Sequence, residues 1–143
     1  MDTSPGQHSV SVAGVIIDDQ QRALLIRRRD NRRWEPPGGI LERDETIHTG
    51  LIREVKEEIG LSVRPIRLSG VYKNMKRGII SLVFRCQAVS GKLTTNEEVS
   101  EFRWASRDEI TNLVDEAFAV RVLDALDEMT APAVRQHDGV HLI

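Results

Sequence analysis

Residues 39–61 constrain the fold most, because they combine a loop, an amphipathic helix and a helix stop. The spacing predicts a helix over residues 45–59, with Asp44 as the candidate N-cap and Gly60 at the left-handed position after the last turn. Apolar residues recur every four positions, which is typical of one stripe packed against a core. This stripe contains Ile47, Leu51, Val55 and Ile59.

A row of acidic residues lies beside the apolar stripe on the same predicted helix. Glu57 and Glu58 follow Glu54 by three and four residues, so the three side chains share one face. Each pair of like charges at this spacing destabilises a helix by about 0.2–0.5 kcal/mol, which favours a bound cation between them. Oxygen ligands of this kind suit Mg²⁺ or Mn²⁺. The alternative is an acidic face in contact with solvent.

The same segment matches the signature of the Nudix hydrolases, G-x5-E-x7-R-E-U-x-E-E-x-G-U, where U is a bulky apolar residue. All nine specified positions are occupied, by Gly39, Glu45, Arg53, Glu54, Val55, Glu57, Glu58, Gly60 and Leu61. The chain therefore resembles this family, and the order of its flanking elements is also similar. The resemblance implies a Nudix-type α/β/α sandwich with a mixed β-sheet, which agrees with strands on both sides of one internal helix.

The resemblance also implies a reaction, the hydrolysis of a phosphoanhydride bond in a nucleoside di- or triphosphate derivative with Mg²⁺ or Mn²⁺ as cofactor. By matching positions, Glu54, Glu57 and Glu58 would bind the metal, and the carbonyl of Gly38 could add a neutral ligand. Glu54 also resembles the residue assigned as the base in some members. Arg53 resembles the family arginine that braces a glutamate by an ion pair, and Glu45 is expected to have a structural role.

A carboxylate outside the signature is a second candidate for the base. In related enzymes an acidic residue from the loop before the last strand reaches the metal site as ligand or base. Here that loop offers Glu97, Glu98 and Glu101. We choose Glu98 because it lies at the loop–strand junction, whereas Glu101 alternates with an apolar residue inside the strand. Glu101, Glu54 and a solvent-exposed acidic turn remain the alternatives.

Five arginines surround the end of the second predicted strand. Strand geometry places Arg27 and Arg29 on one face and Arg28 on the other. Guanidinium groups suit phosphate recognition, so we predict that Arg27, Arg29 and the neighbouring Trp34 bind the substrate. A basic edge that discourages strand pairing is the alternative.

The rest of the chain predicts one domain over residues 1–143, with loose termini at 1–7 and 131–143. Residues 10–17 and 22–29 form a predicted hairpin, 61–73 a bent edge strand, and 79–89 a central strand. A last strand is predicted at 99–105. A capping-box pattern at Ser106 predicts a short helix, and residues 116–128 predict another.

Composition limits the possible partners. A net charge of −2 in 143 residues gives no basic footprint for nucleic acid, so nucleic-acid binding is not favoured. No run approaches the roughly 20 apolar residues that span a bilayer, and the N-terminus lacks the apolar core of a signal peptide. We therefore expect a cytoplasmic location, a small-molecule nucleotide substrate and no membrane partner, with a homodimer left open. The single cysteine, Cys86, is expected to be buried and structural.

The substrate is left open by the sequence. A proline that marks the ADP-ribose branch would fall at Arg77, and the tyrosine of dinucleoside polyphosphate members is absent there too. An ADP-ribose-like compound and an oxidised nucleoside triphosphate are both compatible. A non-catalytic Nudix-like sensor is the alternative of another class, although every specified carboxylate is retained.

Overall fold

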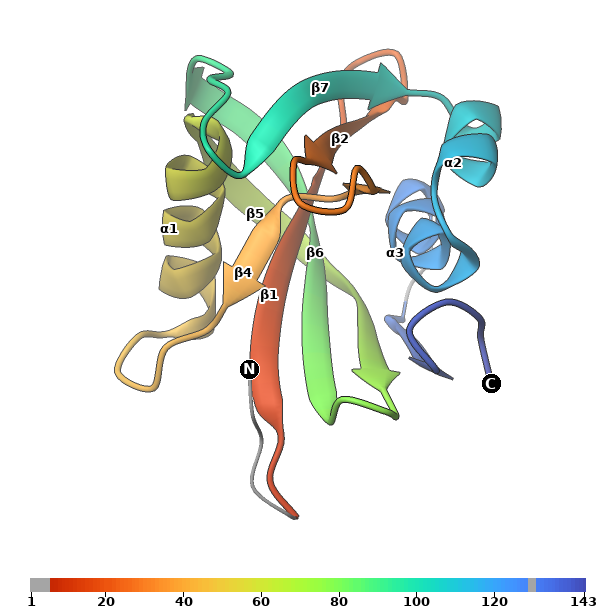
Figure 1. Cartoon of the computed structure of the whole chain (residues 1–143). Helices are drawn as coiled ribbons and strands as arrows, with labels where there is room; N and C mark the ends of the chain where they lie inside the picture. Colours follow the sequence, from red (N-terminus) through yellow and green to blue (C-terminus); the bar gives the residue numbers. More distant parts are fainter. Residues whose placement is uncertain (1–5, 129–130) are drawn as a thin grey trace.

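The computed structural model describes residues 6–128 and 131–143, which form two β-sheets and three helices (Figure 1). The larger sheet is mixed, with strand order β4-β1-β6-β5-β8, and the smaller is antiparallel, with order β3-β2-β7. The strands are β1 (Ser9–Ile16), β2 (Ala23–Arg28), β3 (Trp34–Glu35), β4 (Gly38–Ile40), β5 (Leu61–Asn74), β6 (Ile79–Gly91), β7 (Val99–Ala105) and β8 (Ala133–His137). The helices are α1 (Ile47–Ile59), α2 (Arg107–Leu113) and α3 (Glu116–Leu126).

The larger sheet is covered on both faces, as the α/β/α expectation requires. Helix α1 lies on one side of it, and α2 and α3 lie on the other (Figure 1). Alternation along β1 explains the two cores: Val12 and Ile16 pack in the core with α1, whereas Ala13 and Val15 pack in the core with α3. The central position predicted for residues 79–89 is confirmed, since β6 lies between β1 and β5.

The start of α1 differs from the prediction. The N-cap is Thr46, whose side chain accepts a hydrogen bond from the Thr49 N–H, and Asp44 lies in the preceding loop. Ile47 is exposed, so the buried stripe contains only its three later members. The reason is that Glu45 is held in the loop by Arg53 and cannot begin the helix. Gly60 ends α1 in the left-handed conformation, with φ of 86°, as predicted.

The predicted hairpin of the first two strands is wrong. β1 and β2 belong to different sheets and meet only through an isolated bridge between Ile17 and Ala23. β1 instead pairs in parallel with β6 and antiparallel with β4. Turn residues between two apolar runs indicate a reversal of the chain, but the side-chain pattern does not say which strand each run will pair with.

The C-terminal segment is ordered rather than loose. β8 pairs in parallel with β5, from the Gly70–Ala133 pair to the Asn74–His137 pair, and forms the sheet edge there. β5 is therefore an edge only around Pro65, where the predicted irregularity is present as register shifts. Of the N-terminal residues predicted to be loose, 1–5 lie outside the described part.

The other local predictions agree with the structure. Ser106 and Glu109 form the capping box of α2, and α3 follows. Cys86 is buried, and burial raises the pKa of its thiol to about 12, which fits a structural role. Within the described ranges, no helix is both long and apolar enough to cross a membrane.

Candidate active site

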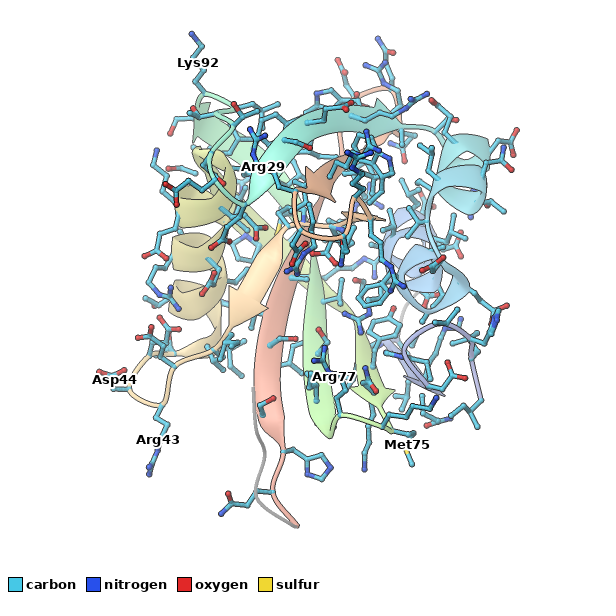
Figure 2. All side chains as sticks on the ribbon, viewed as in Figure 1. Arg29, Arg43, Asp44, Met75, Arg77 and Lys92 are labelled. Atoms are coloured by element: carbon cyan, nitrogen blue, oxygen red, sulfur yellow. The ribbon has the colours of Figure 1, made fainter. Side chains whose placement is uncertain are left out.

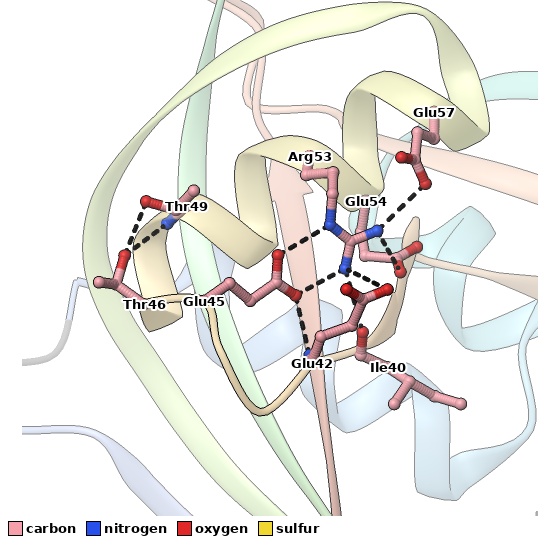
Figure 3. A network of polar contacts seen from close by, with 8 residues as sticks. All are labelled: Ile40, Glu42, Glu45, Thr46, Thr49, Arg53, Glu54 and Glu57. Atoms are coloured by element: carbon pink, nitrogen blue, oxygen red, sulfur yellow. Dashed lines mark hydrogen bonds and ion pairs between the residues drawn. The ribbon is translucent and has the colours of Figure 1, made fainter.

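Arg53 organises the acidic face of α1 (Figure 3). Its Nε and Nη2 donate to the two carboxylate oxygens of Glu45, at 2.8 and 2.6 Å. Its Nη1 donates to Glu54 at 3.0 Å and to Glu57 at 3.1 Å. These hydrogen bonds from Arg53 hold the pKa of Glu45 at about 2. Arg53 is therefore a positioning residue that fixes the loop before α1 relative to two of the candidate metal ligands.

The edge strand β4 packs directly against this acidic face. The Gly38 N–H donates to Oε1 of Glu58 at 3.0 Å. A Cβ atom at position 39 would collide with the carboxylate of Glu54, so Gly39 leaves room for this carboxylate beside β4. The two glycines before the helix thus bring the backbone into contact with both inner carboxylates.

Glu58 is the most perturbed of the candidate ligands. Burial raises its pKa to about 7, although the hydrogen bond from Gly38 opposes the shift, and the nearby carboxylates Glu35, Glu54 and Glu98 raise it further. Burial also raises the pKa of Glu54, against the effect of Arg53. Several carboxylates that destabilise one another's charged forms are typical of a cation-binding or catalytic site.

The loop before β7 completes the acidic site, and Asn96 holds it in place. The Asn96 side-chain amide donates to the backbone carbonyl of Glu58 at 2.7 Å, and its Oδ1 accepts from the N–H of Glu98 at 2.8 Å. A cavity of about 510 Å³ lies between this loop and α1. Its lining contains Glu54, Glu57, Glu58, Asn96, Glu97 and Glu98.

The lining consists of five carboxylates and one carboxamide among the described residues, which fits a hard divalent cation. As the side chains stand, no three His, Cys, Asp or Glu residues in the described ranges converge into a metal cluster. The cause is visible in the hydrogen bonds, because Arg53 draws Glu54 and Glu57 toward itself. Metal binding at this site would require Glu54 and Glu57 to reorient.

The structure separates Glu98 from its alternative Glu101. Glu98 lines the acidic cavity, whereas Glu101 lies on β7 and forms an ion pair with Arg27 at 3.0 Å. This arrangement agrees with the choice of Glu98 at the loop–strand junction, and the side chain of Asn96 holds the backbone of Glu98 there.

The predicted substrate-binding residues lie in different surroundings. The guanidinium of Arg27 lies 5.9 Å from the ring centroid of Trp34, and Nε of Arg29 donates to the Asn96 carbonyl at 2.7 Å. Trp34 lines a cavity of about 470 Å³ on the other side of β3, and the lining of that cavity includes Arg28 but neither Arg27 nor Arg29. Figure 2 shows Arg29 near the loop before β7. The separation of Arg28 from Arg27 and Arg29 agrees with the predicted alternation, although the register shifts between Arg27 and Arg28.

Two residues at the site were not singled out from the sequence. Glu35 is largely buried, accepts from Arg28 at 3.4 Å, and lies close enough to raise the pKa of Glu58. Asn96 ties the acidic loop to α1. A glutamate next to two prolines and an asparagine in a polar loop were the available signals, and both are common in turns without function.

Comparison with known proteins agrees with this geometry. A NUDIX domain model matches residues 7–126. A MutT-like protein of Streptomyces ambofaciens is 52% identical over 141 residues, which cover 99% of this chain and 91% of that protein. An ADP-ribose pyrophosphatase of Methanocaldococcus jannaschii is 35% identical over 100 residues, which cover 65% of this chain but only 59% of that protein.

The fold has close counterparts among solved structures. An ADP-ribose pyrophosphatase from Streptococcus suis superposes with a TM-score of 0.76 at 21% sequence identity, covering 90% of this chain and 99% of that one. The family match spans most of the chain, and three glutamates of the signature, Glu54, Glu57 and Glu58, lie together on α1 beside an acidic cavity. The chain therefore belongs to the Nudix hydrolase family and is a Nudix pyrophosphohydrolase.

Proposed function

We propose that the chain hydrolyses a phosphoanhydride bond in a nucleoside di- or triphosphate derivative and requires Mg²⁺ or Mn²⁺. The observation that carries this proposal is the position of β4. Gly39 contacts Glu54 of the acidic site, and the same strand lines a cavity of about 420 Å³ that also contains Arg28 and Arg77. A ligand in that cavity can extend along β4 toward the carboxylates. ADP-ribose-like compounds and oxidised nucleoside triphosphates both join a nucleoside to a phosphoanhydride, so both classes match such a ligand.

Glu54, Glu57 and Glu58, with the Gly38 carbonyl, would hold the divalent ion that Nudix enzymes typically use. A bound ion of this kind neutralises phosphate oxygens and lowers the pKa of a coordinated water. The protein supplies the remaining requirements, which are orientation and proton removal. Arg53 anchors the loop before α1 through Glu45, and the hydrogen bond from the Gly38 N–H orients Glu58.

Glu98 is the proposed general base. It lies on the cavity wall formed by the loop opposite α1, and Asn96 fixes its backbone. From this wall its carboxylate would accept the proton of the water that attacks phosphorus, while the bond from phosphorus to the leaving oxygen breaks. Glu54 is the alternative base, because it lines the same cavity.

We predict that Glu98→Gln lowers kcat by roughly 10²–10⁴-fold with little change in KM, as expected for the loss of a base. Glu101→Gln is the matched control, since it lies three residues away but pairs with Arg27 outside the cavity. Steady-state kinetics of both variants make the comparison. If Glu101→Gln shows the loss and Glu98→Gln does not, the assignment moves to Glu101. If neither shows it, Glu54 becomes the preferred base.

A second prediction concerns the arginines. Arg27 and Arg29 stay predicted to contribute to phosphate binding, but the cavity linings favour Arg28 for the largest effect. Arg28→Ala should raise KM about tenfold with a smaller change in kcat, because a charge-assisted hydrogen bond contributes roughly 1.5–3 kcal/mol. Arg27→Ala and Arg29→Ala should also raise KM more than they lower kcat, by smaller factors than Arg28→Ala. Unchanged kinetics in all three alanine variants would identify this region as a solvent-exposed basic edge.

A further inference from the structure

A second feature of the molecule lies on the opposite face of the larger sheet from α1. The cavity of about 420 Å³ that β4 borders is also lined by hydroxyls of β1 and β6 and by Arg121 of α3. The hydroxyl groups belong to Ser9, Ser11 and Ser81. A cavity of this size can hold a nucleoside-sized group.

Arg121 is a buried cation with too few acceptors. Only 7% of its surface is exposed. Its Nη1 donates to Oγ of Ser81 at 3.1 Å, and its Nε has no hydrogen-bond partner among the described residues. The buried hydroxyl of Ser9 in the same cavity is also without a partner there. Buried donors are almost always satisfied in folded proteins, so this combination points to an acceptor supplied from outside.

The remaining contact of Arg121, with His137, does not supply the missing hydrogen-bond acceptor. Its Nη2 lies 3.0 Å from Nε2 of His137, while Nδ1 of the same ring accepts from the Gly139 N–H at 2.9 Å. Burial and the neighbouring guanidinium lower the pKa of His137, so the ring is neutral at neutral pH. A neutral imidazole has one acceptor nitrogen, and here two donors face the ring. Either Arg121 or Gly139 is therefore left with an unsatisfied N–H.

The charge of Arg121 is also incompletely compensated. Its guanidinium lies over the ring of Phe118 at 4.5 Å and near that of Tyr72 at 5.4 Å. Its hydrogen bonds in the described structure go to a hydroxyl and an imidazole, not to a carboxylate. The carboxylate of Glu35 is near enough to favour the charged form of Arg121, but it accepts its hydrogen bond from Arg28. Burial lowers its pKa to about 10, so it remains a cation at neutral pH. Aromatic faces stabilise such a cation only in part.

We propose that Arg121 is a specificity-determining residue, which binds an oxygen acceptor in the part of the substrate remote from the cleaved anhydride. The inference rests on the proposed function, because the cavity shares β4 with the acidic site. The acceptor is either a keto oxygen of the base or an additional phosphate oxygen. Arginine favours keto bases over adenine, which presents an amino group at the corresponding edge. Arg28 and Arg77 in the same lining would favour phosphate.

Binding of non-hydrolysable probes to the full chain tests this inference. The probes are GMP, AMP and ribose 5-phosphate, measured by isothermal titration calorimetry on wild type and Arg121→Met. The hydrogen-bond partners of Arg121 are a hydroxyl and an imidazole, so Arg121→Met leaves no hydrogen-bonded carboxylate unpaired, and this variant is expected to fold. Arg67→Met is the control, because Arg67 is a part-buried arginine that donates to backbone carbonyls outside the cavity. Arg121→Lys, which keeps the cation without the fork, serves if Arg121→Met does not fold.

If a keto oxygen is bound, wild type prefers GMP to AMP, and Arg121→Met raises the Kd for GMP about tenfold with little change for AMP. If a phosphate oxygen is bound, Arg121→Met lowers the affinity for all three probes by similar factors. Equal affinities in wild type and the Arg121 variants, or no binding of any probe to wild type, would overturn the inference. Because these probes contain no anhydride, their binding does not depend on turnover. Arg121-dependent binding of the probes, combined with no hydrolysis of any nucleoside di- or triphosphate derivative in a separate assay, would refute the proposed function alone.

Discussion

Glu58→Gln is expected to lower kcat by about 10²–10³-fold while leaving the fold intact. A carboxylate that holds a cation at the reacting phosphate contributes several kcal/mol of charge stabilisation, and each 1.36 kcal/mol corresponds to a factor of ten. The glutamine Oε1 can still accept the hydrogen bond from Gly38. Because Glu58 lies among Glu35, Glu54 and Glu98, removal of its charge should leave Tm unchanged or slightly higher.

The measurement is steady-state hydrolysis at saturating Mg²⁺, together with a thermal unfolding curve for each protein. Asp108→Asn is the matched control, because it removes an exposed carboxylate from α2, far from the acidic cavity in the sequence and in the fold. Wild-type turnover by Glu58→Gln would remove Glu58 from the ligand set. A large fall in Tm would instead indicate a structural role for this carboxylate.

Gly39→Ala is expected to lose catalytic activity, whereas Gly38→Ala is expected to lose stability. At position 39 a Cβ meets the carboxylate of Glu54, the mobile end of a side chain, so the fold should tolerate it. Glu54 would be displaced, and a shift of about 1 Å in a site of this kind costs roughly 10²-fold in rate. At position 38 a Cβ overlaps the backbone of Val12 and Ala13, which cannot move without breaking the pairing of β4 with β1.

Denaturant unfolding and kinetics of the two variants distinguish these effects. Gly38→Ala should lose about 1–3 kcal/mol of unfolding free energy, as overpacking of a core does. Gly39→Ala should keep most of its stability and lose most of its turnover. Full activity in Gly39→Ala would show that the close contact of β4 with Glu54 is unimportant for the reaction.

The sequence predicted those features that depend on local periodicity. The acidic row of α1, its end at Gly60 and the capping box at Ser106 follow from spacings of three and four residues, and all are present. The central position of β6 follows equally from its continuous apolar run, although only its first part, up to Cys86, is buried or half-buried. Ile47 is the exception, because it is exposed. Arg53 holds Glu45 in the preceding loop, so Ile47 is the first residue of the helix.

Features that depend on pairing between distant segments could not be predicted in this way. β8 is ordered by parallel pairing with β5, some sixty residues earlier, and has no strong pattern of its own. The backbone at Glu98 is held by a turn that the side chain of Asn96 closes. The deficit of acceptors around Arg121 arises from α3, β6 and β8 together, so no single stretch of sequence contains it.

The central claim is that the carboxylates of α1 form a metal-dependent hydrolytic site for a nucleotide anhydride. Chromatography of products from a panel of nucleoside di- and triphosphate derivatives, with Mg²⁺, with a chelator, and with Mg²⁺ restored, tests it most directly. We predict that at least one compound is cleaved at an anhydride bond, that the chelator abolishes cleavage, and that added Mg²⁺ restores it. Cleavage that persists in the chelator, or nucleotide binding without cleavage of any compound, would contradict the claim.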